Sequence, residues 1–524
     1  MKRDIFPMTK HQDLPDNTPI IIAAAQHVER LQPQSQPLSQ PAFSAPMDLA
    51  AIASALALKD AGISAQEVDT IAVIRLFSDA SAVWASPFGG SNNPPESVAR
   101  RIGATPSHRI YSNSGGTEPL RIMAELLQDI ARGEKTTALL TGAEAIANQR
   151  FATRNGYEAD WHEEFDTPFD NRKHMEMFVA KQEIECGVAL PVRAYGLIEN
   201  AQARRLGHSR EQHIKYMAEL MAPFSTVAAA NPYSQWAHSY TAQSLAEITQ
   251  DNYAISLPYS KRFVAQDAVN QSAALLLTSA GNARRLGVNP RQWIFVEAFA
   301  QGADQALSQR ADITRSVAME QVLKATMNMA TATCADMDLI DIYSCFPCAV
   351  HAACEPLGLA TDGSRALTVT GGLPYFGGPG NSYCTHALAE VAVQLRGQAS
   401  RALITGNGGF LSKHAAAVLT SDAARAGNIR WDSDELFTVD ANSIAARPLI
   451  DHAQRGDIVS YTVVTRRDKE DMGIILGETP NGERFLASTT ALATTRAMVD
   501  NSPIGRAVNV KIMDERPVFS FHSE

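Results

Sequence analysis

The sequence lacks the features that mark membrane-spanning, nucleic-acid-binding and disulfide-stabilised proteins. Its 524 residues contain no run of about 18 uncharged apolar residues, the length a membrane-spanning helix requires. Acidic residues outnumber basic ones, 56 to 46, and the net charge of −10 disfavours binding to nucleic acid or to anionic membranes. Only six cysteines are present, and their clustering does not suggest a disulfide framework. The first residues show no apolar segment typical of a secretory signal, so we expect a reduced, cytoplasmic protein.

The composition is that of a globular chain with ample material for a core. Hydrophobic residues make up 45% and charged residues 19% of the sequence. A length of 524 residues predicts roughly three to four domains.

Two stretches of the chain resemble one another along their length. Residues 119–145 and 383–409 each have the pattern of a helix, a short turn and an apolar strand that ends in Thr-Gly. Their strand segments, ALLTG and ALITG, begin at Ala138 and Ala402, 264 positions apart. A second pair of apolar strands, VDTIAVIRLF from Val68 and MDLIDIYSCF from Met337, lies 269 positions apart. Two matches in the same order predict two similar α/β halves, each a mostly parallel sheet covered by helices.

Changes of pattern along the chain predict the domain boundaries. The first half comprises residues 17–150 and 261–296, and the second half comprises residues 297–425. Between them, residues 151–260 form an irregular and partly helical insertion, which we expect to build a lid or a substrate pocket. Residues 426–524 alternate β-branched residues with turn signals, which predicts a small antiparallel β domain, barrel-like and of the OB type.

Five motifs in this order resemble those of the thiolase superfamily, and the resemblance covers most of the chain. The stretch TPIIIAAAQHVER resembles the first thiolase strand. The stretch RIYSNSGGTEPLRIMAEL resembles the thiolase nucleophile region, and ARGEKTTALLTGAEAI resembles the strand that follows it. The Asn-Glu-Ala-Phe or His-Asp-Cys-Phe motif is replaced by DIYSCFP. The Gly-His-Pro and Cys-x-Gly motifs are replaced by GGLPYFGGPGNSY and TGNGGF. With the extra β domain, the chain is most similar to type-1 thiolase-like proteins, which implies an acetyl-CoA acetyltransferase-like fold and a role in lipid metabolism.

The resemblance also shows which catalytic groups are missing. A thiolase needs a nucleophilic cysteine, a histidine that activates it and a second cysteine that moves a proton. The nucleophile position falls on Gly115 or Ser114, and the Asn or His of the second motif falls on Tyr343. The histidine of Gly-His-Pro falls on Gly378, and the cysteine of Cys-x-Gly falls on Gly406. None of these keeps the chemistry of the family, so ordinary thiolysis is not expected.

Backbone groups offer a different binding chemistry. The loops at Gly115–Gly116 and at Gly378 precede equivalent helices, and free N–H groups at a helix start favour an oxyanion or a thioester carbonyl. Glycine also lets a ligand approach the backbone closely, although the same glycines would serve tight turns and helix packing equally well. The remaining candidates for this oxyanion and substrate site are Asn381, Gly406, Asn407 and Gly408.

Four side chains are candidates for the chemistry itself. Tyr343 follows a buried strand, and its phenol would donate to a carbonyl more readily than act as a base, since its ordinary pKa is about 10. Cys345 begins a Cys-x-x-Cys-x-x-His-x-x-Cys series whose helical spacing does not bring all members to one ion, so no metal site is expected. Cys345 is either core or a replacement thiolate. The third candidate is His414, which we expect on a loop beyond the glycine-rich turn. The fourth is Ser114, on the turn before the helix that begins near residue 119.

Two functional classes are compatible with these residues. The first is an enzyme that handles an acyl-CoA thioester in carbon–carbon bond chemistry, acyltransferase-like or retro-aldol, without the thiolase cysteine. It would hold no bound cofactor, and the coenzyme A thioester would be its small-molecule substrate. The second is a non-catalytic acyl-CoA-binding or scaffold protein. The resemblance leaves open a homodimer or a monomer.

Overall fold

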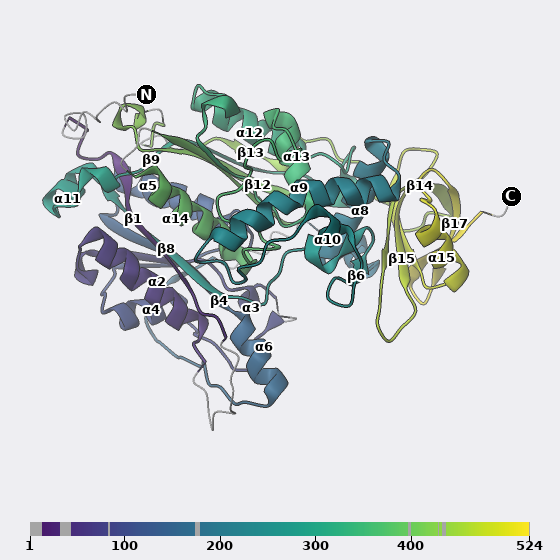
Figure 1. The fold of residues 1–524 in the computed structure, drawn as a ribbon, viewed down its shortest axis with the longest axis horizontal. Helices are drawn as coiled ribbons and strands as arrows, with labels where there is room; N and C mark the ends of the chain where they lie inside the picture. Colours follow the sequence, from purple (N-terminus) through teal and green to yellow (C-terminus); the bar gives the residue numbers. More distant parts are fainter. Residues whose placement is uncertain are drawn as a thin grey trace.

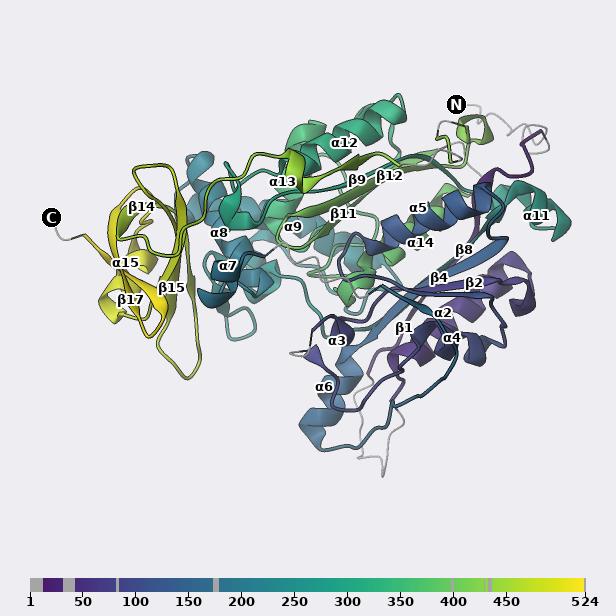
Figure 2. The same cartoon turned by 180° about the vertical axis from the view of Figure 1, so that it is seen from behind.

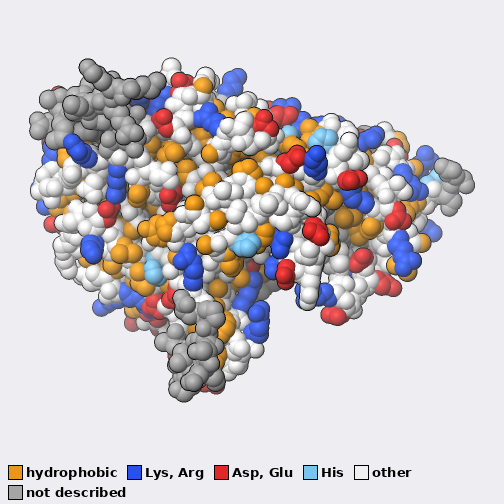
Figure 3. Space-filling model, viewed as in Figure 1, with side chains coloured by type: hydrophobic (Ala, Val, Ile, Leu, Met, Phe, Trp, Pro, Cys, Tyr) orange, Lys and Arg blue, Asp and Glu red, His pale blue; other side chains and the backbone are white. Residues whose placement is uncertain are grey.

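Two α/β halves lie side by side, and a β domain lies at one end of the molecule (Figures 1 and 2). The computed structural model describes residues 13–31, 43–81, 84–172, 179–396, 400–427, 429–431 and 436–522. None of the helices in these ranges is long and apolar enough to cross a membrane. On the face shown in Figure 3, basic and acidic side chains are interspersed among apolar ones, unlike the basic stripe of a nucleic-acid-binding surface.

Each half is built on one mixed sheet, and the two sheets repeat the same order of strands. The order β1-β8-β4-β2 of the first sheet recurs as β9-β12-β11-β10 in the second, with the same parallel and antiparallel pairings. This match confirms the predicted duplication. The sheets are mixed rather than mostly parallel, because β8 and β12 run antiparallel to both neighbours. The strands are β1 (Pro19–Val28), β2 (Thr70–Val73), β3 (His108–Tyr111), β4 (Thr137–Ala145), β5 (Asp170–Asn171), β8 (Asn270–Ser279), β9 (Phe295–Ala303), β10 (Leu339–Asp341), β11 (Arg401–Gly408), β12 (Lys413–Thr420) and β13 (Thr438–Val439).

The helices form layers on and between the sheets. Helices α5 (Glu118–Ala131) and α14 (Tyr383–Leu395) contact strands of both sheets and each other, so they are buried on most sides. This position explains why apolar residues surround α14 instead of following one stripe. Helix α2 (Pro46–Ala61) covers the first sheet and α12 (Val317–Met329) the second. The remaining helices of the two halves are α3 (Phe77–Ala80), α4 (Pro94–Ile102), α11 (Ala280–Arg285) and α13 (Pro347–Leu357).

The insertion contacts both halves and the C-terminal domain. Its helices are α6 (Ile146–Asn155), α7 (Lys181–Glu185), α8 (Pro191–Arg205), α9 (Arg210–Ala230) and α10 (Ala242–Ala246). Helices α8 and α9 pack against α13 of the second half. Strand β5 pairs with β3 at the edge of the first sheet. Strands β6 (Ala254–Ser256) and β7 (Tyr259–Ser260) extend the sheet of the C-terminal domain through β14.

The C-terminal domain is a five-stranded closed barrel. Its strands follow the order β15-β16-β18-β17-β14, and the pairing of β14 with β15 closes the ring. The barrel is mixed rather than purely antiparallel, since β16 and β18 run parallel. Strand β13 pairs with β9, so this segment extends the second sheet and the barrel begins later in the chain. The elements are β14 (Arg455–Val464), β15 (Met472–Glu478), β16 (Arg484–Thr489), α15 (Leu492–Asp500), β17 (Ala507–Met513) and β18 (Arg516–Phe521).

Candidate functional site

The turn before α5 faces the end of β11, and Gly116 is the residue that points toward it. A Cβ atom on Gly116 would lie 2.5 Å from the hydroxyl of Tyr343 and closer still to the carbonyl oxygen of Asn407. A Cβ atom on Gly115 would meet only Thr117 Oγ1, at 3.8 Å. The phenol of Tyr343 therefore occupies the space in front of Gly116. Of the turn residues, Gly116 faces the other candidates, whereas the sequence favoured Gly115 or Ser114 for the nucleophile position.

A small internal cavity of about 10 Å³ lies beside this contact, and we call it the inner cavity. Tyr343, Asn407 and His414 line it together with Thr405, Gly406 and apolar residues of α12 and α13. Burial raises the pKa of Tyr343 well above its usual value, so the phenol remains protonated. Its backbone N–H donates to Thr405 Oγ1 at 2.9 Å, and its ring meets the ring of Tyr383 edge to face at 5.4 Å. Tyr343 is therefore a fixed hydrogen-bond donor.

His414 provides an unprotonated ring nitrogen. Its Nε2 lies 3.1 Å from the carbonyl oxygen of Leu411 and 2.9 Å from Ser316 Oγ. A carbonyl only accepts hydrogen bonds, so Nε2 carries the hydrogen and Nδ1 carries the lone pair. Nδ1 is buried and has no partner among the described residues. Burial lowers the pKa of His414 to about 3, which keeps the ring neutral.

The position of His414 differs from the expected loop. The residue lies in β12, directly opposite Asn407 of β11. The hairpin turn closes within residues 409–412, where Gly409 and Leu411 both have positive φ angles. The glycine-rich segment is therefore a tight turn, and it ends two residues before His414.

Asn407 uses its amide differently from the expected oxyanion donor. Its Nδ2 donates to the hydroxyl of Tyr195 at 2.9 Å and to Cys345 Sγ at 3.7 Å. Its Oδ1 is buried without a partner among the described residues. The free atom of Asn407 is consequently an acceptor. Burial raises the pKa of Cys345 to about 12, so a thiolate at this position is disfavoured.

The insertion supplies a tyrosine that sequence reasoning did not identify. Tyr195 of α8 stacks on Phe346, with ring centroids 4.3 Å apart and planes inclined by 15°. Its hydroxyl accepts hydrogen bonds from Asn407 and from the N–H of Leu411, at 3.1 Å. Tyr195 thus fixes both the end of β11 and the turn that follows it. No local pattern around residue 195 marks this role.

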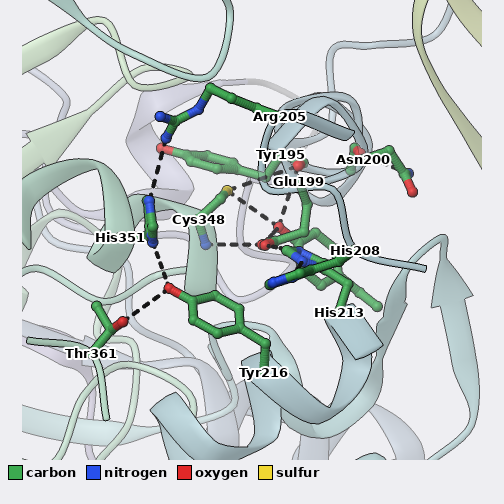
Figure 4. Close-up of polar contacts among 12 residues, drawn as sticks. Tyr195, Glu199, Asn200, Arg205, His208, His213, Tyr216, Cys348, His351 and Thr361 are labelled. Carbon is green, nitrogen blue, oxygen red and sulfur yellow. Dashed lines mark hydrogen bonds and ion pairs between the residues drawn. The ribbon is translucent and has the colours of Figure 1, made fainter. Parts of the chain in front are cut away.

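Glu199, one turn further along α8, is the centre of a buried polar network (Figure 4). It accepts hydrogen bonds from His213 Nε2 at 2.7 Å and from the hydroxyl of Tyr259 at 2.6 Å. It also accepts from the backbone N–H of Cys348 at 2.9 Å. The N-cap residue of α13 is Phe346, whose side chain cannot accept a hydrogen bond from the free N–H groups at the helix start. Glu199 of α8 supplies the acceptor instead. The network therefore holds the start of α13 and the Tyr343–Phe346 segment before it.

The cysteine and histidine series of α13 is spread over separate partners. His351 Nδ1 lies 2.5 Å from the hydroxyl of Tyr216, and its Nε2 lies 3.3 Å from Arg205 (Figure 4). Cys348 lies instead beside Tyr259 and Glu199. Within the described ranges, no three His, Cys, Asp or Glu side chains are grouped so that they could hold a metal ion.

The loop around Gly378, the second glycine loop, contacts the loop at Gly115–Gly116, the first glycine loop, but does not line the inner cavity. The N–H of Gly378 donates to the carbonyl oxygen of Gln266 at 2.7 Å. Asn381 accepts from the N–H of Gly115 at 2.9 Å and donates to the carbonyl oxygen of Arg75 at 2.9 Å. These groups tie the halves together and are already occupied. Ser114 is half-buried and does not line the inner cavity.

Gly406 and Gly408 allow β11 to approach the turn before α5. A Cβ atom on Gly408 would lie 3.3 Å from the backbone nitrogen of Gly116, and one on Gly406 would lie 3.0 Å from Leu120 Cδ1. The close approach places Asn407 beside Gly116.

A larger cavity of about 460 Å³, which we call the outer pocket, is also lined by His414. It lies between the start of α5, the ends of β9 and β12, and the segment from β13 to Asn442. Its lining residues are Thr117, Arg121, Gln301, Gly302, Ala303, Lys413, His414, Thr438, Val439, Asp440, Ala441 and Asn442. His414 lines both cavities, so it is the residue that the two cavities share.

Comparison with known proteins places this arrangement in one class. Residues 300–421 match the thiolase C-terminal domain-like family, and residues 439–516 match the additional C-terminal domain of thiolase-like protein type 1. The acetyl-CoA acetyltransferase of Methanothermobacter thermautotrophicus (strain Delta H) is 27% identical over 240 residues, 43% of this chain and 59% of that protein. The chain thus spans less than two thirds of this relative. The Ltp2–ChsH2(DUF35) aldolase shares the fold, with a TM-score of 0.54 at 16% identity over 78% of this chain and 98% of that chain.

The fold and the duplicated loops define a thiolase-like protein. A monomeric SCP2-thiolase-like protein type 1 from Mycobacterium smegmatis is 30% identical, with a TM-score of 0.79 over 97% of this chain and 100% of that chain. The chain belongs to this family of thiolase-like proteins type 1.

Proposed function

We propose that the site acts on an acyl-CoA thioester in carbon–carbon bond chemistry of the aldol or retro-aldol type. The observation that carries this proposal is the pairing of a protonated phenol on Tyr343 with an unprotonated Nδ1 on His414, beside the start of α5. The raised pKa of Cys345 disfavours a thiolate there, so the proposed reaction uses no acyl group carried on this cysteine. The Methanothermobacter relative supports the substrate class through its name, acetyl-CoA acetyltransferase. The aldolase of the same fold supports the reaction class.

The retro-aldol direction can be written with these groups alone. His414 Nδ1 takes the proton of the β-hydroxyl group, the Cα–Cβ bond breaks, and its electron pair passes into the thioester enolate. The enolate oxygen accepts a hydrogen bond from Tyr343 and from the N–H groups of Gly116 and Thr117, which form no hydrogen bond within the described ranges. The enolate carbon then takes up the proton. The products are a carbonyl compound and a shortened acyl-CoA.

The low pKa of His414 fits this sequence of events. An empty buried site disfavours the imidazolium ion, whereas a developing enolate beside the ring stabilises it. The ring therefore gains basicity only when substrate is bound and returns its proton readily. The phenol needs no tuning, because it acts as a donor.

A turnover experiment tests the proposal. The protein is incubated with acetyl-CoA, acetoacetyl-CoA and β-hydroxyacyl-CoA esters, and binding is followed by calorimetry while turnover is followed by chromatography of the CoA products. Tyr343→Phe should lower kcat about 100-fold or more with little change in KM, the range typical of a lost proton donor. Tyr216→Phe, remote from the cavity, is the matched control. Cys345→Ala should leave turnover intact, since its thiol is not used.

A second candidate function is non-catalytic binding of the same thioesters. The observation that favours it is the size of the inner cavity, about 10 Å³, which holds no more than a water molecule until side chains move. Binding without turnover across the panel would favour this candidate over the enzyme. Failure of every ester to bind would refute both.

We also propose that the chain acts as a monomer. The Mycobacterium relative is monomeric, and β5 of this chain occupies the edge of the first sheet beside β3. Light scattering at several concentrations tests this point, and a mass twice that of the chain would contradict it.

A further inference from the structure

Two residues that line the outer pocket each carry a buried polar atom that has no partner among the described residues. Thr117 Oγ1 and His414 Nδ1 are both unpartnered among the described residues, and the two side chains are 1% and 2% exposed. A buried polar group without a partner is costly, so two such groups at one cavity indicate a ligand that satisfies them. His414 Nδ1 requires a donor such as a hydroxyl group. Thr117 Oγ1 can donate to a carbonyl oxygen at the N-terminal end of α5.

Two basic residues and one acidic residue line the same pocket. Arg121 lies one helical turn after Thr117 on the same face of α5, and Lys413 lies at the start of β12. The carboxylate of Asp440 is the one acidic group among the lining residues, and it accepts hydrogen bonds from Asn442. Arg121 is held in place by Glu118 at 2.6 Å and by Gln301 at 2.9 Å, with 40% of its side chain exposed. The guanidinium group is thus positioned at the pocket before a ligand arrives.

We propose that the outer pocket binds a carboxylate at the far end of the acyl chain, so that the substrate is a carboxylated β-hydroxyacyl thioester. This inference rests on the proposed function and names its substrate class. The hydroxyl group would bind His414, the thioester carbonyl would lie at Thr117, and the carboxylate would lie between Arg121 and Lys413. Four residues of α-helix span about 6 Å, the reach of a short acyl chain. The phosphates of coenzyme A are separated from the thioester by the whole pantetheine arm, which is far longer.

The test compares four ligands of one acyl length. 3-Hydroxyglutaryl and 3-hydroxyvaleryl groups differ in the terminal carboxylate, and each is prepared both as the CoA ester and as the N-acetylcysteamine ester, which lacks phosphates. Calorimetry gives the four dissociation constants. We expect the carboxylated ester to bind about 10-fold to 100-fold more tightly than its uncharged partner in both series, the range of a charge-assisted hydrogen bond.

Variants assign the effect to the pocket. Arg121→Gln should abolish the preference for the carboxylated ester, and Arg121→Lys should restore part of it. Lys324→Gln removes the same charge from an exposed position of α12 outside the pocket and should leave the preference unchanged. Thermal unfolding of each variant checks that the fold is retained.

The outcomes separate this inference from the function on which it rests. Equal binding of charged and uncharged esters, with turnover present, would overturn the carboxylate site and leave the enzyme standing. A preference for CoA esters over N-acetylcysteamine esters that Arg121→Gln removes would assign the pocket to phosphate instead and would also overturn it. If none of the four ligands binds, the proposed function itself fails.

Discussion

Replacement of Glu199 by glutamine tests whether the buried network holds the candidate site together. Glu199 is fully buried and receives three hydrogen bonds, from His213, Tyr259 and the N–H of Cys348. Glutamine keeps the shape and one oxygen acceptor, so Tyr259 and Cys348 can retain their bonds. The negative charge at the start of α13 and the bond to His213 are lost.

The magnitude follows from these contacts. A hydrogen bond to a charged group contributes about 1.5–3 kcal/mol, and a charge at a helix N-terminus about 0.3–1 kcal/mol. We therefore expect Glu199→Gln to lower the free energy of unfolding by about 2–4 kcal/mol. Glu199→Ala should cost about 3–5 kcal/mol, because all three donors then remain buried and unpaired.

Urea unfolding followed by circular dichroism measures both values. The matched control is Glu355→Gln, at the other end of α13, where the carboxylate pairs with Arg205 and is about one-third exposed. Exposed pairs contribute about 1 kcal/mol or less, so this variant should stay close to the wild type. A loss below about 0.5 kcal/mol for Glu199→Gln, or an equal loss for Glu355→Gln, would refute the argument.

Three further predictions concern other groups. Burial raises the pKa of Glu144 to about 8, so between pH 4.5 and 8 the folded state keeps a proton that the unfolded state releases. The free energy of unfolding should therefore fall as the pH rises from 4.5 toward 8, by up to about 1.4 kcal/mol per pH unit. Urea titrations at about pH 5.5 and 8.5 measure this slope, and Glu144→Gln should flatten it. Gly116→Ala should destabilise the protein by about 1–3 kcal/mol, whereas Gly90→Ala, with open space around its Cβ, should be neutral in thermal melts. Cys334 is the one half-buried thiol among six, so Cys334→Ser should remove the fast phase of labelling by a thiol reagent, and a fast phase that persists would contradict the burial of the others.

The duplicated fold could be predicted from the sequence because its signals are local. The strands at residues 138–142 and 402–406 and the helices before them follow apolar patterns that do not depend on distant contacts. The direction of β8 and β12 does depend on such contacts, since an apolar run has the same composition in a parallel and an antiparallel pair. The sheets were therefore expected to be mostly parallel, and they are mixed.

The candidate site could be predicted only in part, because its parts come from four distant segments. Tyr343 and Asn407 lie at strand ends, where the pattern of the chain favours functional residues. Tyr195 and Glu199 lie in the insertion and act on residues about 150 to 210 positions away, so neither spacing nor composition marks them. Tyr195 and Glu199 are four residues apart and therefore lie on one face of α8. The sequence does not show that this face contacts the start of α13, which has no side-chain cap of its own.

The two glycine loops also show how a repeated motif can divide its roles. The repeat predicts two equivalent helix starts, each able to bind an oxyanion. In the structure, Asn381 of the second loop bonds to the N–H of Gly115 in the first, and Gly378 bonds to Gln266. These contacts occupy the N–H of Gly378 and the side chain of Asn381, whereas the N–H groups of Gly116 and Thr117 form no hydrogen bond within the described ranges. Because the second loop lines neither the inner cavity nor the outer pocket, we expect one ligand per chain, at the start of α5, in spite of the internal symmetry.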